Sequence, residues 1–162
     1  MSDKKKHILF TYSQYTVAST LAFAKRLLAM FPSGEFETHT LLLDGDRPDA
    51  VFQDYVRPIK SSLYLHFNFD CLGFLFNSYD DTPFYNTFWT PCVTYLTVPA
   101  ARLSAELGRD WNLNITVLCG SAAETKYVQT HYPEISDVRT VINPLTSAAP
   151  LYQTLLEIAR RY

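Results

Sequence analysis

Residues 63–99 read LYLHFNFDCLGFLFNSYDDTPFYNTFWTPCVTYLTVP, and this stretch decides the fold. The apolar runs at 63–69 and 92–98 have the length and the aromatic and β-branched content of strands. The segment between them is dense in Tyr, Phe, Asn and Asp, and a tyrosine offers an apolar ring with a polar tip. We therefore interpret residues 63–99 as two strands that carry a recognition wall for a ligand.

On both sides of this stretch, the sequence alternates between strand and helix patterns. Strands are predicted at 7–12, 36–43, 63–69, 92–98, 114–119 and 137–142. Helices are predicted at 17–31, 48–56, 100–107, 121–131 and 150–161, with a helical turn at 83–88. Such alternation is typical of a parallel sheet covered on both faces. The predicted fold class is α/β, a three-layer αβα sandwich with a Rossmann-like, mostly parallel sheet of five to six strands.

Length and composition indicate one domain. The chain has 162 residues, and 48% of them are apolar, which is enough for a single core. We expect a flexible basic tail at residues 1–6 and a single Rossmann-like α/β domain at 7–162. The formal charge is −2, and the basic residues are scattered apart from the lysine run at 4–6, so nucleic-acid binding is not expected.

Targeting and redox signals are few. No apolar run approaches the roughly 18 residues of a membrane span, and the first apolar run is too short for a secretory leader. A cytoplasmic location with reduced thiols is expected. Neither the cysteines nor the histidines have metal-site or disulfide spacing, so we predict no metal and no cofactor. These residues are Cys71, Cys92, Cys119, His7, His39, His66 and His131.

Polar residues follow most of the predicted strands. In an open doubly wound sheet, ligands bind beyond the carboxyl ends of the strands, near the point where the strand order reverses. Tyrosines of the central segment are added as a wall that could contact the ligand. The candidate ligand-binding residues are Thr11, Ser13, Gln14, Asn68, Asp70, Tyr79, Tyr85, Thr97, Ser121 and Asn143. For each residue alone, an ordinary polar loop is the competing interpretation.

Two predicted helices begin with capping signals. Ser13 or Thr16 is expected to cap the first helix, a role that competes with ligand binding by these hydroxyls. Ser121 and Glu124 form a capping-box pattern at the start of the helix predicted at 121–131.

No motif supplies a complete catalytic apparatus. The first turn lacks G-x-G-x-x-G, and the chain has only five glycines, which disfavours a dinucleotide or P-loop site. The G-x-S-x-G motif of serine hydrolases is absent. Asp80 and Asp81 precede Thr-Pro and are interpreted as a turn, and His66 as a strand histidine with satisfied partners rather than a base. The catalytic residues are therefore unknown.

Several segments together point to one family. They are Phe-Asn-Phe at 67–69, Pro-Phe-Tyr-Asn at 83–86, Thr-Val-Pro at 97–99, YVQTHYP at 127–133 and Asn-Pro at 143–144. In this order, they resemble the N-terminal half of GT-B-type bacterial glycosyltransferases, over residues from about 7 to 145. The group that is most similar carries Asp-His-Pro after the corresponding strand, whereas this chain has Thr97, Val98 and Pro99.

The resemblance implies a division of labour between two Rossmann-like domains. The N-terminal domain mainly holds a sugar or glycan acceptor, and a C-terminal domain mainly holds the nucleotide sugar. This chain is long enough for one of them. Because Thr97 and Val98 replace the Asp-His pair, the resemblance implies that this chain alone is not catalytically complete.

The leading functional prediction is an acceptor-binding domain of a glycosyltransferase. One alternative is a non-catalytic module that senses a ligand or docks a protein, including a homodimer that buries Tyr79, Tyr85 and Trp89. Another is a flavodoxin-like domain that binds a mononucleotide through the hydroxyl-rich first turn.

Overall fold

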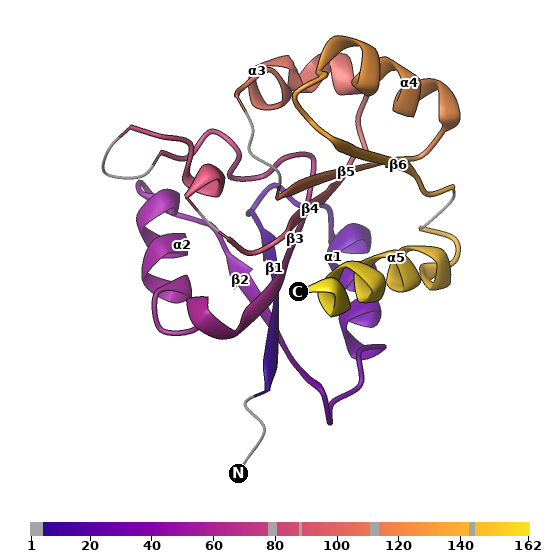
Figure 1. The fold of residues 1–162 in the computed structure, drawn as a ribbon. Helices are drawn as coiled ribbons and strands as arrows, with labels where there is room; N and C mark the ends of the chain where they lie inside the picture. The colour runs from indigo at the N-terminus through magenta and orange to yellow at the C-terminus, as the bar shows by residue number, and fades with distance from the viewer. Residues whose placement is uncertain (1–4, 78–80, 88, 111–113, 143–144) are drawn as a thin grey trace.

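A computed structural model describes residues 5–77, 81–87, 89–110, 114–142 and 145–162. Its sheet contains six strands, β1 (Lys6–Tyr12), β2 (Phe36–Leu42), β3 (Leu63–Phe69), β4 (Cys92–Tyr95), β5 (Ile115–Cys119) and β6 (Asp137–Thr140). All neighbouring strands are parallel, in the order β2-β1-β3-β4-β5-β6 (Figure 1). The predicted fold class is confirmed.

Helices lie between most of the strands, and one more follows the last strand. They are α1 (Ala18–Ala29), α2 (Pro48–Val56), α3 (Ser104–Leu107), α4 (Ala122–His131) and α5 (Ala148–Arg161), with 3₁₀ turns η1 (Lys60–Ser62), η2 (Phe84–Asn86) and η3 (Ala100–Leu103). Pro48 begins α2, where its missing N–H costs no helical hydrogen bond. Within the described ranges, no helix combines the length and the apolar character needed to cross a membrane.

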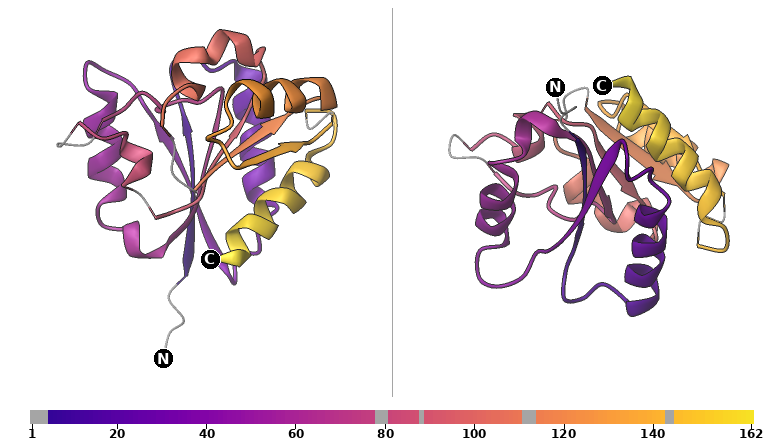
Figure 2. Two further views of the ribbon diagram at one scale, coloured as in Figure 1. Left: turned by 45° about the horizontal axis from the view of Figure 1, so that its top comes forward. Right: turned by 90° about the horizontal axis from the view of Figure 1, so that it is seen from below.

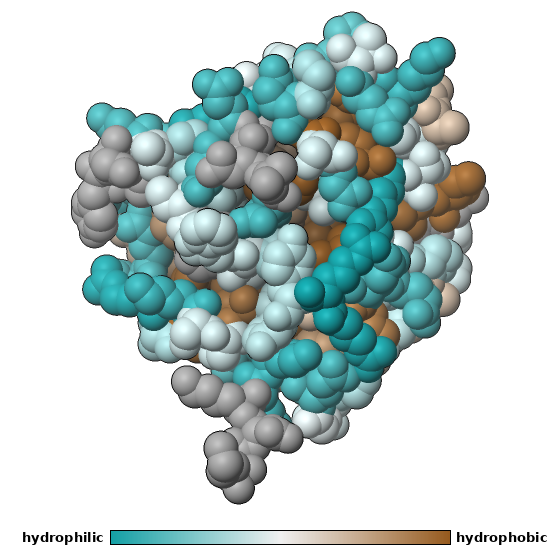
Figure 3. All heavy atoms as spheres, viewed as in Figure 1, coloured by the Kyte–Doolittle hydropathy of each residue, from teal (hydrophilic) through white to brown (hydrophobic). Residues whose placement is uncertain are grey.

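The sheet has a separate hydrophobic core on each face, because alternate strand residues point to opposite sides. On one face, Phe10 and Phe67 pack with Leu27 of α1 and Leu155 of α5. On the other, Leu9, Val117, Phe52 of α2 and Val128 of α4 pack together. Figure 2 shows the sheet between α2 on one side and α1 and α5 on the other. Hydrophilic side chains cover much of the face in Figure 3.

The strand order reverses at one point in the sheet. From β1 the chain moves outward to β2 and then returns to β3 on the opposite side of β1. This single reversal, between β1 and β3, is that of a flavodoxin-like sheet extended by β6, and it differs from the 3-2-1-4-5-6 order of dinucleotide-binding sheets. All six carboxyl ends lie at one edge, where the loops after the strands are brought together.

The predicted N-cap of α1 is wrong. Helix α1 begins one residue later than expected, and its N-cap is Val17, which makes no side-chain cap hydrogen bond. The Ser13 N–H instead donates to the Thr16 hydroxyl at 3.0 Å, and the Thr16 N–H to the Ser13 carbonyl at 3.0 Å. The two residues close the turn after β1 and have no part in the helix.

Candidate functional site

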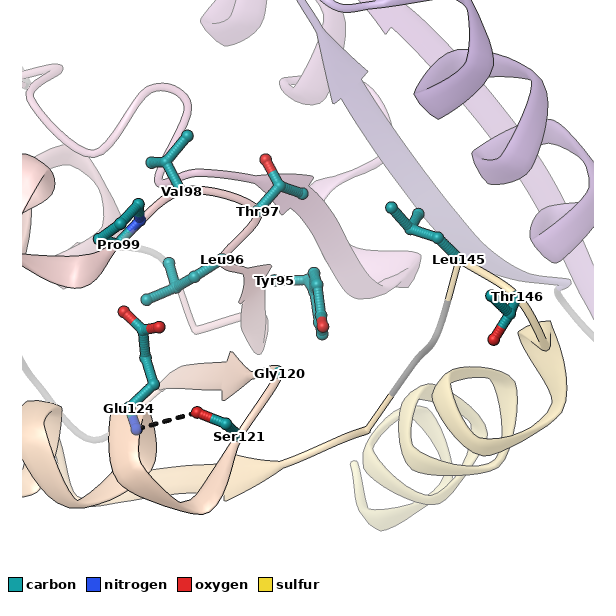
Figure 4. A pocket seen from close by; sticks show the side chains of 10 residues that line it. All are labelled: Tyr95, Leu96, Thr97, Val98, Pro99, Gly120, Ser121, Glu124, Leu145 and Thr146. Carbon is teal, nitrogen blue, oxygen red and sulfur yellow. Dashed lines mark hydrogen bonds between the residues drawn. The ribbon is translucent and has the colours of Figure 1, made fainter.

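An open pocket of about 450 Å³ lies at the carboxyl ends of β4 and β5 (Figure 4). We call it the edge pocket, and it is lined by Tyr95, Leu96, Thr97, Val98, Pro99, Gly120, Ser121, Glu124, Leu145 and Thr146. Three segments contribute to it: the loop after β4, the start of α4, and the loop before α5. Segments far apart in sequence therefore converge on one hollow at the predicted edge of the sheet.

Asp70 fixes the wall that follows β4. It directly follows β3 and has a left-handed backbone, with φ of +52°. Its carboxylate accepts hydrogen bonds from the Thr97 N–H at 2.6 Å, from the Val98 N–H at 3.1 Å, and from the Thr97 hydroxyl. Asp70 therefore anchors the pocket wall, and its carboxylate is committed to that role.

The predicted capping signal at the start of α4 is confirmed for Ser121. The Ser121 hydroxyl accepts a hydrogen bond from the Glu124 N–H at 3.2 Å, drawn in Figure 4. The Glu124 carboxylate does not complete the reciprocal bond of a capping box. It accepts the Ala100 N–H of η3 at 2.6 Å, so it ties the loops after β4 and β5 together across the base of the pocket.

Tyr95 and Gly120 form the floor between these walls. The Tyr95 hydroxyl donates to the Val141 carbonyl at 3.4 Å, and burial raises the pKa of this phenol. A Cβ on Gly120 would lie 2.9 Å from the Tyr95 hydroxyl, so a side chain there would force Tyr95 to shift. The floor is therefore fixed by packing.

The lining of the edge pocket combines polar and apolar groups. Hydroxyls of Thr97, Ser121 and Thr146 and the carboxylate of Glu124 lie around apolar side chains of Leu96 and the neighbouring residues. None of the described lining residues is basic, so the pocket offers no side-chain cation to a phosphate.

The structure brings some of the predicted site residues together and separates others. Thr97 and Ser121 line the edge pocket, and Asp70 supports it. Ser13 and Gln14 follow β1, on the other side of the reversal point, and do not line the pocket. Two other predicted residues, Tyr79 and Asn143, lie outside the described residues.

Thr11 and Asn68 are buried, which corrects their assignment to a ligand site. Their exposed fractions are 1% and 0%. The Thr11 hydroxyl is 2.8 Å from His66 Nε2, and His66 Nδ1 is 3.5 Å from the Cys92 thiol, to which the Asn68 amide donates at 3.6 Å. Because β1 and β3 are covered on both faces, these polar side chains point under the helices and not toward the edge.

Burial determines the protonation of this cluster. It lowers the pKa of His66 to about 3 and raises the pKa of the Cys92 thiol. His66 is the satisfied strand histidine that the sequence predicted. Among the described residues, the Asn68 side-chain oxygen finds no hydrogen-bond partner. All three cysteines are buried free thiols.

Three rings of the aromatic segment belong to the core, so the interpretation of the segment as a recognition wall is wrong for Phe74, Phe84 and Tyr85. Phe74, Phe84 and Tyr85 are at most 8% exposed. Tyr85 is stacked on His66 with ring centroids 5.5 Å apart, and Phe84 meets Phe52 of α2 edge to face at 5.1 Å. The segment covers this face of the sheet beside α2, which leaves Tyr85 no surface for a ligand.

Trp89 is 89% exposed, but it lies at the opposite edge of the sheet. It lines a hollow with Tyr64 and Pro91, at the amino ends of β3 and β4. It therefore takes no part in the edge pocket.

Sequence reasoning missed part of the edge pocket. Leu145 and Thr146 lie in the loop between β6 and α5, from which the strand-end rule had selected Asn143 alone. Glu124 was recognised as a capping residue only.

Comparisons with protein-family models, with curated proteins and with solved structures find no match for this chain. The fold and the edge pocket therefore define its class, a doubly wound parallel α/β domain with a ligand-sized pocket at the carboxyl edge. The similarity to glycosyltransferases stays a prediction.

Proposed function

We propose that this chain is the acceptor-binding domain of a glycosyltransferase and that the edge pocket binds a sugar of the acceptor. The observation that carries the proposal is the arrangement of the edge pocket, where hydroxyls and one carboxylate from three segments surround apolar side chains. A sugar has the complementary pattern, with apolar ring faces and a rim of hydroxyls that both donate and accept hydrogen bonds.

The chemistry of the lining supports binding more than transfer. Glu124 is the only acidic side chain among the described lining residues, and its Oε1 accepts the Ala100 N–H. Thr97 is hydrogen bonded to Asp70. Where the similar glycosyltransferases carry an Asp-His pair, this chain has Thr97 and Val98, which cannot act as a general base. Sugar transfer would then need a second domain that holds the nucleotide sugar.

The direct test is a titration of ¹⁵N-labelled protein with neutral mono- and disaccharides, followed by NMR. We expect shifts confined to the backbone amides around Thr97, Ser121 and Thr146, with dissociation constants of about 1 mM for a single sugar. Nucleotide sugars should bind no more tightly than their sugar parts.

Two matched variants locate the binding. Leu145→Trp places a large ring at the margin of the edge pocket and should weaken sugar binding at least several-fold. Leu75→Trp changes a leucine of similar exposure, 51% against 48%, that does not line the edge pocket, and it should leave binding unchanged. Equal effects of both variants, or shifts that map elsewhere, would contradict the proposal.

The strand order favours a second candidate, a mononucleotide-binding domain. In flavodoxin-like sheets, the ligand lies where the strand order reverses, here between the ends of β1 and β3. The turn at residues 13–16 offers hydroxyls there, whereas the Asp70 carboxylate is already hydrogen bonded. Yellow colour of the purified protein, or NMR shifts at residues 13–16 on adding flavin mononucleotide, would support this candidate over the sugar.

A further inference from the structure

Three metal-ligating side chains meet at the end of the sheet that is remote from the edge pocket. His7 belongs to β1, and its register partner on β2 is Glu37. Glu37 and His39 are two residues apart on β2, so their side chains leave the same face of the strand. Register and strand period together place His7, Glu37 and His39 side by side.

The ligand atoms of the three residues converge. His7 Nδ1 lies 2.8 Å from His39 Nε2, and His39 Nε2 lies 3.7 Å from Glu37 Oε1. All three atoms are within 4.8 Å of one another. Ligands of a tetrahedral Zn²⁺ ion, at about 2.0 to 2.2 Å from the metal, are about 3.3 to 3.6 Å apart. The two observed distances, 2.8 Å and 3.7 Å, lie just below and just above the distances expected around Zn²⁺.

We propose that His7 Nδ1, His39 Nε2 and a Glu37 carboxylate oxygen bind a divalent first-row transition metal ion, with Zn²⁺ as the expected ion. Two imidazoles and one carboxylate form a donor set that suits zinc, and three protein ligands leave a fourth position for water. The two imidazole nitrogens would separate by about half an ångström, and the exposed carboxylate would move inward to complete the set.

Tyr55 of α2 contacts the ring nitrogen of His39 that does not face the other two candidate ligands. Its hydroxyl lies 2.9 Å from His39 Nδ1, and the two rings meet edge to face. Metal-bound histidines usually have their other ring nitrogen held by a hydrogen-bond partner, which fixes the tautomer and the ring orientation. When His39 Nδ1–H donates to the Tyr55 hydroxyl, the lone pair of Nε2 is directed at His7 and Glu37.

The nearest described cation along β1 does not crowd the three ligand atoms. Lys6 is the nearest cation along β1, but it pairs with Glu35 and lies over the Tyr64 ring. Its charge is thereby directed away from the three ligand atoms.

A bound ion would stabilise the edge of the sheet. β2 is an edge strand, and the candidate ligands join it to β1, while Tyr55 joins it to α2. The competing interpretation is that a single N–H···N hydrogen bond between His7 and His39 does this without a metal. The two interpretations differ in whether adding metal changes anything.

The experiment uses the full chain without a histidine tag, stripped with a chelator and titrated with ZnCl₂ by calorimetry. We expect one ion per chain with a dissociation constant of about 1 µM or lower, and a rise in melting temperature of about 5 to 10 °C at a hundredfold excess over that constant. Imidazole ¹⁵N shifts should change for His7 and His39 and stay unchanged for His66.

Variants with matched controls test the ligands. Glu37→Gln and His39→Gln should each weaken Zn²⁺ binding more than about tenfold, and Tyr55→Phe by about tenfold. Glu134→Gln and His131→Gln, which change exposed residues elsewhere, should bind Zn²⁺ like the parent. Because Glu37 is exposed, Glu37→Gln tests the site even if His39→Gln fails to fold.

The proposal is overturned if the parent binds no Zn²⁺ at 100 µM, a concentration about a hundredfold above the expected constant. It is equally overturned if Glu37→Gln and Glu134→Gln bind alike, or if the imidazole shifts move at His131 alone. None of these outcomes depends on the sugar-binding proposal.

Discussion

The Asp70 carboxylate, at the end of β3, receives both the backbone N–H and the hydroxyl of Thr97, at the end of the neighbouring strand. One side chain thus joins the exits of two adjacent strands. This link shapes the wall of the edge pocket, and its energetic weight can be measured.

Removing the link should destabilise the domain. Asp70→Ala leaves the Thr97 and Val98 N–H groups without their acceptor and should lower the free energy of unfolding by about 2 kcal/mol. Thr97→Val removes one bond and should cost about 1 kcal/mol. Urea unfolding measures both, and the double variant should cost less than the sum because the two residues share one interaction. Thr38→Val, at an exposed position of β2, is the control, and a loss as large as that of Thr97→Val would argue against the link.

Gly73 should not tolerate a side chain. Its φ is +86°, and an added Cβ would lie 2.8 Å from the Tyr85 hydroxyl. We expect Gly73→Ala to lower the free energy of unfolding by about 2 kcal/mol, partly through the left-handed backbone and partly through crowding. Adding Tyr85→Phe should restore part of the loss. Gly34→Ala, where nothing lies within 4 Å, should change stability by less than about 0.5 kcal/mol; equal losses at the two glycines would refute the steric explanation.

Acid should destabilise the protein through His66. Its pKa falls from 6.5 in the unfolded chain to about 3 in the folded protein, so between these values only the unfolded state takes up the proton. Above pH 6.5, His66 does not reduce the free energy of unfolding. Between pH 6.5 and about pH 3, protonation of the unfolded state lowers this free energy by about 1.4 kcal/mol per pH unit.

The comparison of two glutamine variants isolates the contribution of His66 to the acid sensitivity. His66→Gln should show a shallower loss of stability between pH 6 and pH 4 than the parent, in urea unfolding followed at several pH values. His131→Gln replaces an exposed histidine and should keep the parental slope. A parental slope in His66→Gln would mean that other groups cause the acid sensitivity.

The uncapped start of α1 offers a stabilising substitution. Val17 is the N-cap, is 65% exposed, and the first turn contains no acidic residue. Val17→Asp should supply both a cap acceptor and a favourable charge and raise the free energy of unfolding by about 1 kcal/mol. Thermal unfolding of Val17→Asp against Val17→Ala tests this, and equal melting temperatures would show that the first turn is satisfied in another way.

The order of elements could be predicted because it depends on local patterns. Six strands and five helices were recognised from apolar periodicity and from Pro and Gly signals. The end of β4 was not, since Leu96 and Val98 continue a strand-like pattern. In the structure β4 ends at Tyr95, and the Thr97 N–H donates to the Asp70 carboxylate, which is distant in sequence. A pattern along the chain cannot reveal such a contact.

The site was harder to predict because it depends on what covers each strand. Thr97 and Ser121 follow their strands and reach the pocket. Thr11 and Asn68 are polar as well, but they lie inside covered strands, and their partners His66 and Cys92 come from strand pairing. The meeting of His7 with Glu37 and His39 likewise depends on the register between β1 and β2, which spacing along the chain does not reveal.

The position of α5 also bears on how the chain is made. This helix follows every strand in sequence, yet Leu151 and Leu155 complete the core over β3 that also contains Phe67 and Leu27. During synthesis on the ribosome, α1 covers only part of that face of the sheet, and the rest stays uncovered until residues 148–161 have emerged. A nascent chain stalled before α5 would therefore expose an apolar sheet face, and chaperones that bind such surfaces would meet this domain late in translation.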